Sequence, residues 1–140
     1  MNAPVACQSY QQTQIETASP ERLLLMLYSA ALWRLERAKT ALQEHNYRET
    51  HDLLTKVQDI VLELMVSLDW ETGSEICSSL HSLYDYVYRR LVQANIHKDL
   101  GAIDESVQIL SDLQSGWEQV ILHQKSVAKP VPVSRLNIKG

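Results

Sequence analysis

The chain has 140 residues, a hydrophobic fraction of 45%, a formal net charge of −4 and an isoelectric point near 5.7, which together predict one acidic domain with a substantial buried core. The acidic balance disfavours nucleic acid and anionic membrane surfaces as partners. No apolar run approaches the ~20 residues of a membrane span, and the N-terminal residues lack the apolar core of a secretion signal, so we expect a cytoplasmic protein without membrane insertion.

The first helix is predicted from about residue 20 to 43, after a polar arm that covers residues 1–18. Ser19 can accept a hydrogen bond from a free N–H of the first turn, and Pro20 stands where its missing N–H costs nothing. Apolar residues recur at spacings of three and four on one face, as in a coiled-coil seam. They are Leu24, Tyr28, Ala31, Leu35, Ala38 and Leu42.

The second helix is predicted to begin near Asn46, with Glu49 completing a variant of the capping box, and to end before the turn-like residues that start at Asp69. A third helix is expected from Ser74, which can cap it, to about His97. The seam of the second helix is Leu53, Val57, Ile60, Val61, Leu64 and Leu68, and that of the third is Cys77, Leu80, Tyr84, Val87, Tyr88 and Leu91.

The fourth helix is predicted to begin between residues 99 and 102 and to end at about Gln124. Its seam is Ile103, Val107, Leu110, Leu113, Trp117, Val120 and Ile121. Four helices with short links favour an all-α fold, an antiparallel up-down four-helix bundle over residues 19–125. Residues 1–18 should form a flexible arm, and residues 126–140, which hold Pro130 and Pro132, a disordered tail.

Residues for catalysis or metal binding are not arranged in any familiar pattern. The five histidines follow no ligand spacing, neither cysteine has a nearby histidine in sequence that would suggest an activated thiolate, and four glycines form no phosphate-binding loop. We therefore expect no enzyme, no metal and no cofactor.

Several large apolar residues point away from the seams, at ~100° per residue of helix. Scattered apolar residues occur on every protein surface, but five of them on three helices favour a partner-binding surface. A partner helix could dock there through apolar residues at spacings of three, four and seven. The five are Met26, Trp33, Leu62, Val66 and Tyr86.

The tyrosine-rich segment 83–95 has mainly structural interpretations. Tyr84 and Tyr88 are expected in the core. Asp85 and Arg89 should form an i,i+4 ion pair on the helix surface. Arg89 and Arg90 could instead meet acidic residues of the second helix, Asp59 or Glu63.

Two segments resemble the flagellar export chaperones of the FliS family. One is Tyr-Gln-Gln at residues 10–12, with Thr-Ala-Ser-Pro ending at Pro20 and Leu-Met-Leu-Tyr ending at Tyr28. The other is Leu-Tyr-Asp-Tyr-Val-Tyr-Arg-Arg-Leu-Val-Gln-Ala-Asn at residues 83–95. Further similarity runs through residues 59–69, 73–76, 95–99, 103–105 and 116–117.

The resemblance implies a cytoplasmic chaperone that binds the disordered C-terminal region of flagellin, prevents its premature polymerisation and delivers it to the export gate of the flagellar type III secretion apparatus. It implies that the client wraps around the bundle in an extended way. It also implies that the N-terminal arm, here around Tyr10 and Ile15, covers part of the client surface and takes part in docking to the export gate. The apolar residue that accompanies Tyr10 three positions earlier in the family is Cys7 here.

Two alternatives stay open. The same bundle could bind a regulatory protein of the flagellar system, such as an anti-sigma factor, because an apolar groove is permissive. It could also be a structural bundle that self-assembles through Trp33 and Tyr86. The free protein is expected to be a monomer or a weak homodimer.

Overall fold

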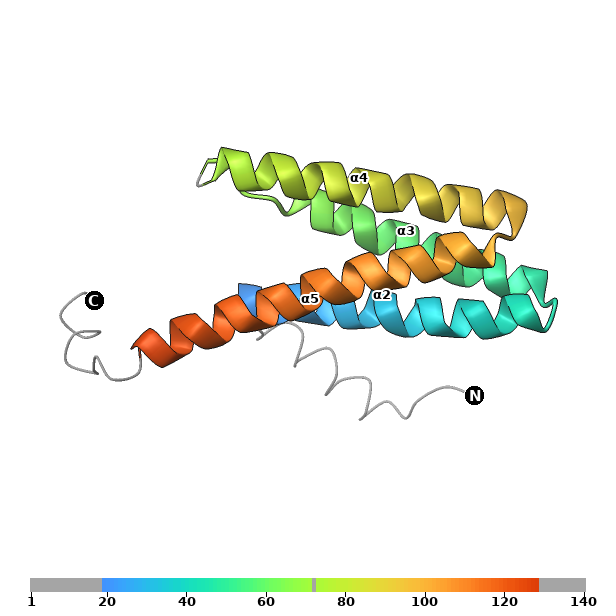
Figure 1. Ribbon diagram of the computed structural model, residues 1–140, viewed down its shortest axis with the longest axis horizontal. Helices are drawn as coiled ribbons and strands as arrows, with labels where there is room; N and C mark the ends of the chain where they lie inside the picture. Colours follow the sequence, from blue (N-terminus) through green and yellow to red (C-terminus); the bar gives the residue numbers. More distant parts are fainter. Residues whose placement is uncertain (1–18, 72, 129–140) are drawn as a thin grey trace, which may run out of the picture.

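The fold consists of four long helices joined by short links (Figure 1). The structure is a computed structural model that describes residues 19–71 and 73–128, and no strand occurs within these ranges. The helices are α2 (Pro20–Gln43), α3 (Tyr47–Val66), α4 (Ser74–His97) and α5 (Leu100–Ala128). No helix in the described ranges is long and apolar enough to cross a membrane. The predicted all-α four-helix bundle is confirmed.

Each helix packs against the helices that precede and follow it along the chain, and α2 packs against α5 to close the ring. Because the links are short, successive helices run in opposite directions, as in an up-down bundle. One ion pair and one hydrogen bond support the interface between α2 and α5. Lys39 Nζ lies 3.0 Å from Asp104 Oδ1, and Gln114 Nε2 donates to Ser29 Oγ at 2.9 Å.

Helix starts follow the capping signals in two of three predicted cases. Ser19 Oγ accepts a hydrogen bond from the backbone N–H of Arg22, and Asn46 Oδ1 accepts one from the backbone N–H of Glu49. The prediction that Ser74 caps α4 is wrong: Gly73 is the N-cap, and Ser74 is the first helical residue. The backbone carbonyl of Gly73 already accepts from Cys77 N, so the cap falls one residue earlier than expected.

The core runs along the bundle axis and consists of aliphatic, alanine and two tyrosine side chains (Tyr28, Ala31, Leu35, Ala38, Leu42, Leu54, Val57, Val61, Leu64, Tyr84, Val87, Leu91, Ala94, Ala102, Ile103 and Leu110). In α3 the buried face is centred on Leu54 and Val57, while Leu53 and Ile60 of the predicted seam are only partly buried. Thr50 also lies on this face, where its hydroxyl donates to the carbonyl of Asn46.

A chain of three hydrogen-bonded side chains crosses the core between α2, α4 and α5. The hydroxyls of Tyr28 and Tyr84 lie 2.5 Å apart, and Trp117 Nε1 donates to the Tyr28 hydroxyl at 3.2 Å. Burial raises the pKa of both tyrosines, so both hydroxyls stay protonated at neutral pH. Tyr28 therefore joins two partners on two other helices.

Replacing Tyr28 with phenylalanine should lower the free energy of unfolding by about 2 kcal/mol, because it leaves both the Tyr84 hydroxyl and the Trp117 N–H without this partner. The Tyr84→Phe variant should lose about 1 kcal/mol, because Tyr28 still accepts from Trp117. Urea denaturation followed by circular dichroism measures both. Equal losses of unfolding free energy in the two variants would contradict the role of Tyr28 as the residue that binds both other side chains.

Candidate partner-binding surfaces

The partner-binding residues predicted on α2 lie on its outer face. Trp33 is 57% exposed, whereas Met26, two turns earlier on the same face, is only partly exposed. Tyr10 and Ile15 lie outside the described residues, so their predicted role stays a prediction. The outward position of Trp33 follows from the seam, because Ala31 and Leu35 turn the opposite side of the helix into the core.

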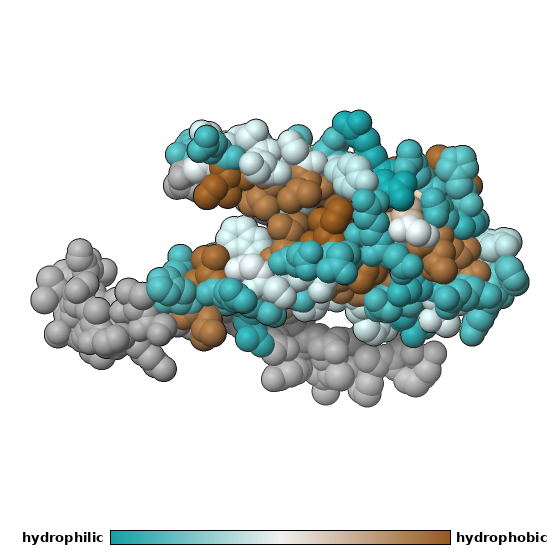
Figure 2. Space-filling model, in the orientation of Figure 1, coloured by the Kyte–Doolittle hydropathy of each residue, from teal (hydrophilic) through white to brown (hydrophobic). Residues whose placement is uncertain are grey.

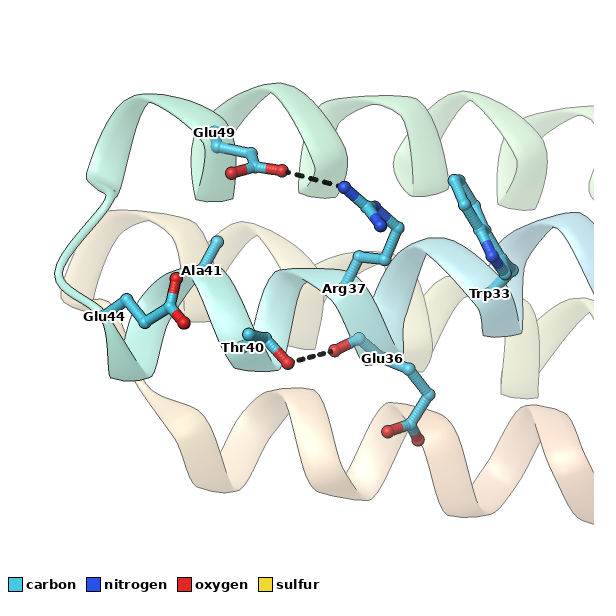
Figure 3. Close-up of a pocket in the computed structure, with 7 residues that line it drawn as sticks. All are labelled: Trp33, Glu36, Arg37, Thr40, Ala41, Glu44 and Glu49. Carbon is cyan, nitrogen blue, oxygen red and sulfur yellow. Dashed lines mark hydrogen bonds and ion pairs between the residues drawn. The ribbon is translucent and has the colours of Figure 1, made fainter.

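A polar pocket of about 360 Å³ adjoins Trp33 on α2 and reaches the start of α3 (Figure 3). The guanidinium of Arg37 lies 5.0 Å from the centre of the Trp33 ring and 3.4 Å from a carboxylate oxygen of Glu49. Arg34 lies over the same ring at 5.7 Å. These cations hold the indole by cation–π attraction while leaving more than half of it open to a partner.

On α3, the predicted residues Leu62 and Val66 are 42% and 79% exposed. They are one turn apart on the same face, so they form a short apolar stripe on the outside of the bundle. The buried residues Val61 and Leu64 occupy the opposite side of the helix. Nothing in the described part of the bundle explains so exposed a pair of aliphatic side chains.

Tyr86, the residue predicted on α4, is 43% exposed and also joins α4 to α5. Its hydroxyl donates to Glu105 Oε2 at 2.7 Å, and Arg90 Nε donates to Glu105 Oε1 at 2.7 Å. The expectation that Arg90 meets Asp59 or Glu63 is wrong, because this side of α4 faces α5 rather than α3. Arg89 pairs with Asp85 at 2.5 Å, as predicted.

Hydrogen bonds from Tyr86 and then Arg90 hold the pKa of Glu105 below its usual value. The folded carboxylate therefore adds stability above the unfolded pKa of about 4.3, and this contribution is lost as the pH falls through the lower folded pKa. We expect the Glu105→Gln variant to unfold at a lower urea concentration than wild type at pH 7. The difference should shrink as the pH falls below about 4.3. A difference that persists unchanged at pH 3 would contradict this role.

A second, more apolar pocket of about 420 Å³ was not predicted from the sequence. It lies between the first two turns of α2 and the end of α3, and its lining residues are Pro20, Glu21, Leu23, Leu24, Leu27, Glu63 and Ser67. Leu24 was assigned to the seam, yet it is only partly buried. The sequence did contain a signal for apolar surface here, the run of leucines from Leu23 to Leu25. Three consecutive residues of a helix cannot all face one core.

A cleft between α4 and α5 is a further feature that was not predicted from the sequence. The two helices lie close at the turn that joins them and diverge toward the start of α4 (Figure 1), where the surface is hollowed and apolar (Figure 2). Ile76 and Leu83 of α4 are exposed, and so is Val120 of α5. Ile76 and Leu83 are seven residues apart, a spacing that marks one helix face and was available in the sequence.

These surfaces lie on different faces of the bundle, so the structure does not gather the predicted residues into one site. Such an arrangement suits a partner that contacts several faces in turn, rather than a small ligand in one deep pocket. Within residues 19–71 and 73–128, no group of three or more histidine, cysteine or acidic residues could hold a metal ion.

Comparison with known proteins gives a consistent result. The family described as "Flagellar protein FliS" matches residues 2–125. The flagellar secretion chaperone FliS of Bacillus subtilis is 36% identical over 117 residues, covering 84% of this chain and 86% of the relative. The flagellar secretion chaperone FliS of Salmonella typhimurium is 37% identical over 117 residues, covering 80% of this chain and 87% of the relative.

A solved structure described as a flagellar chaperone from bacteria has the same fold. It superposes with a TM-score of 0.71 at 22% sequence identity, and the match covers 84% of this chain and 98% of that one. Residues 126–140 lie beyond the match to the family.

Proposed function

Because the chain belongs to the FliS family of flagellar secretion chaperones, we propose that it binds the C-terminal region of flagellin in the cytoplasm, prevents premature polymerisation and delivers flagellin to the flagellar type III export apparatus. The FliS family is a family of chaperones and not of enzymes, in agreement with the expectation from the sequence. The observation that carries the finer proposal is the spread of exposed apolar side chains over several helices.

A disordered client suits these dispersed surfaces. An unfolded segment can follow the outside of the bundle and place apolar side chains successively against Trp33 on α2, against Leu62 and Val66 on α3, and in the α4–α5 cleft. Because the client loses conformational freedom on binding, a large contact surface is needed for a given affinity.

The test is titration calorimetry of the full chain against the C-terminal region of its flagellin, about 50 residues, at several temperatures. We expect one-to-one binding with a strongly negative heat-capacity change, because apolar surface is buried while the client folds. No heat at any temperature would overturn the flagellin proposal. Binding of a flagellar regulatory protein by the same apolar residues would then be the function to test.

The N-terminal arm gives a second prediction. If the region around Tyr10 and Ile15 covers part of the client surface in the free protein, deleting residues 1–17 should strengthen client binding or promote self-association. Calorimetry and sedimentation velocity measure the two effects. Unchanged behaviour in both would contradict the covering role. Export assays of the same deletion test the proposed docking to the export gate.

A further inference from the structure

The cleft between α4 and α5 has apolar walls on both helices. Tyr86 and Arg90 mark the side of α4 that faces α5, because both bond to Glu105. At ~100° per residue, Ile76 and Leu83 belong to this same side of α4. Both are exposed. Figures 1 and 2 show that α4 and α5 diverge toward the start of α4.

The α5 wall follows from the same reasoning. Starting from Glu105, which faces α4, the helical period brings Ile109, Leu113, Gly116 and Val120 to the cleft side. Ile109 and Leu113 are partly buried and Val120 is exposed, so the wall becomes more open toward the end of the helix.

Gly116 lies in the middle of this wall. A Cβ atom placed on it meets nothing within 4 Å, so no contact within the bundle requires glycine there. Glycine inside a helix costs about 1 kcal/mol relative to alanine. A glycine of this kind leaves room for another backbone to approach α5 closely.

The chain supplies a segment that could fill this space. Residues 129–140 follow α5 directly and contain the apolar residues Val131, Val133, Leu136 and Ile138. Pro130 disfavours helical geometry at Lys129. The Pro-Val-Pro sequence favours an extended backbone that needs no partner strand.

The tail is long enough to reach the cleft if it reverses direction near Lys129 and Pro130. An extended chain advances about 3.1 Å per residue, so Ile138 can return roughly 22 Å from Val131. A helix rises 1.5 Å per residue, which puts Leu113 about 22 Å before Ala128. Leu136 and Ile138 can thus lie beside Gly116 and Leu113.

Charge favours the same placement. The tail holds three of the 13 basic residues of the chain and none of the 17 acidic ones, so the rest of the chain, with ten basic residues, has a formal charge of −7. Glu75 near the start of α4 and Asp112 on α5 are exposed carboxylates at the level of the cleft. A basic apolar segment is attracted to an apolar cleft in an acidic domain.

We propose that residues 131–138 of the chain's own tail fold back along α5 and occupy the α4–α5 cleft, with Leu136 and Ile138 as the main apolar contacts. The docked tail covers Leu83, Gly116 and Val120 when no client is present. A client that uses the cleft must then displace the tail.

The test uses ¹H–¹⁵N correlation spectra of the full chain. The variant Leu136→Asp with Ile138→Asp should shift the amide signals of Leu83, Leu113, Gly116 and Val120 relative to wild type, because it releases the tail. The control variant Ser134→Asp with Asn137→Asp adds the same charge to the same tail and should leave those signals in place. Shifts confined to residues 129–140, or equal shifts in the two variants, would overturn the proposal.

A reciprocal pair of variants tests the cleft from the other side. Gly116→Leu fills the space at the cleft wall and should shift the amide signals of Leu136 and Ile138. Ser115→Leu adds the same side chain to the neighbouring exposed position of α5 and should not. Unchanged tail signals in Gly116→Leu would show that the tail lies elsewhere.

Competition with the client rests on the proposed function, whereas the spectra above contain no client. If the tail occupies the cleft about two-thirds of the time, the Leu136→Asp with Ile138→Asp variant should bind the flagellin fragment about threefold more tightly than wild type. Equal affinities would overturn the competition. Absence of binding by either protein would overturn the flagellin proposal and leave tail docking to be decided by the spectra.

Discussion

Replacing Leu62 and Val66 together with glutamine is expected to weaken binding of the flagellin C-terminal segment at least tenfold. Both side chains are aliphatic, exposed and one turn apart on α3, so a partner helix can bury them together. Two well-packed apolar contacts contribute on the order of 2 kcal/mol to binding, which is more than a factor of ten in affinity. Titration calorimetry against the same fragment measures the loss.

The matched control is the variant Asp52→Gln with Lys56→Gln, which places two glutamines one turn apart at exposed positions ten residues earlier on α3, on another face of the helix. It should bind the fragment like wild type, and both variants should unfold at the wild-type temperature, since none of the four residues is buried. If the control loses as much affinity as the Leu62 and Val66 variant, the apolar stripe is not a contact surface. If only the stripe variant unfolds early, the loss reflects stability instead.

The Leu91→Ala variant is expected to lower the free energy of unfolding by about 3 kcal/mol. Leu91 is fully buried on α4 within the central core, so truncation removes apolar contacts and leaves a cavity that the surrounding helices fill only in part. For a bundle of this size the midpoint of thermal unfolding should fall by roughly 10 °C. Differential scanning calorimetry gives both quantities.

Ile96→Ala on the same helix provides the comparison, because Ile96 is 69% exposed and lies just beyond the core residue Ala94. Its free energy of unfolding should stay within about 0.5 kcal/mol of wild type. A loss close to that of Leu91→Ala would mean that Ile96 is covered in solution, for example by a second copy of the chain. Sedimentation velocity would then test for self-association.

The sequence patterns predicted the four helices and most of the core because each helix has a regular apolar face and two have clear start signals at Ser19 and Asn46. The end of α5 was predicted four residues too early. No helix-breaking residue occurs between Gln124 and Ala128, and the first one in this region is Pro130. A pattern of apolar residues indicates where a helix stops packing against the core. The helix itself can continue until it meets a residue, such as proline, that interrupts helical geometry.

The candidate surfaces were predicted less completely, for a different reason. Residues such as Trp33 and Val66 were found because they lie opposite a seam on their own helix. The partners of Tyr86 and Arg90, and the divergence of α4 from α5, depend on which helices are neighbours and at what angle. Helical periodicity on one segment carries no information about the angle between two segments.

The order of the helices around the bundle also has a consequence for folding kinetics. Three of the four interfaces join helices that are consecutive in the chain, so each can form after closure of a short link, and only the interface between α2 and α5 brings distant parts of the chain together. Domains dominated by such local contacts fold in microseconds to milliseconds. We therefore expect α5 to dock onto α2 in the last step of folding. Substitutions that remove the contact of Lys39 with Asp104, or that of Ser29 with Gln114, should then raise the unfolding rate more than they lower the folding rate.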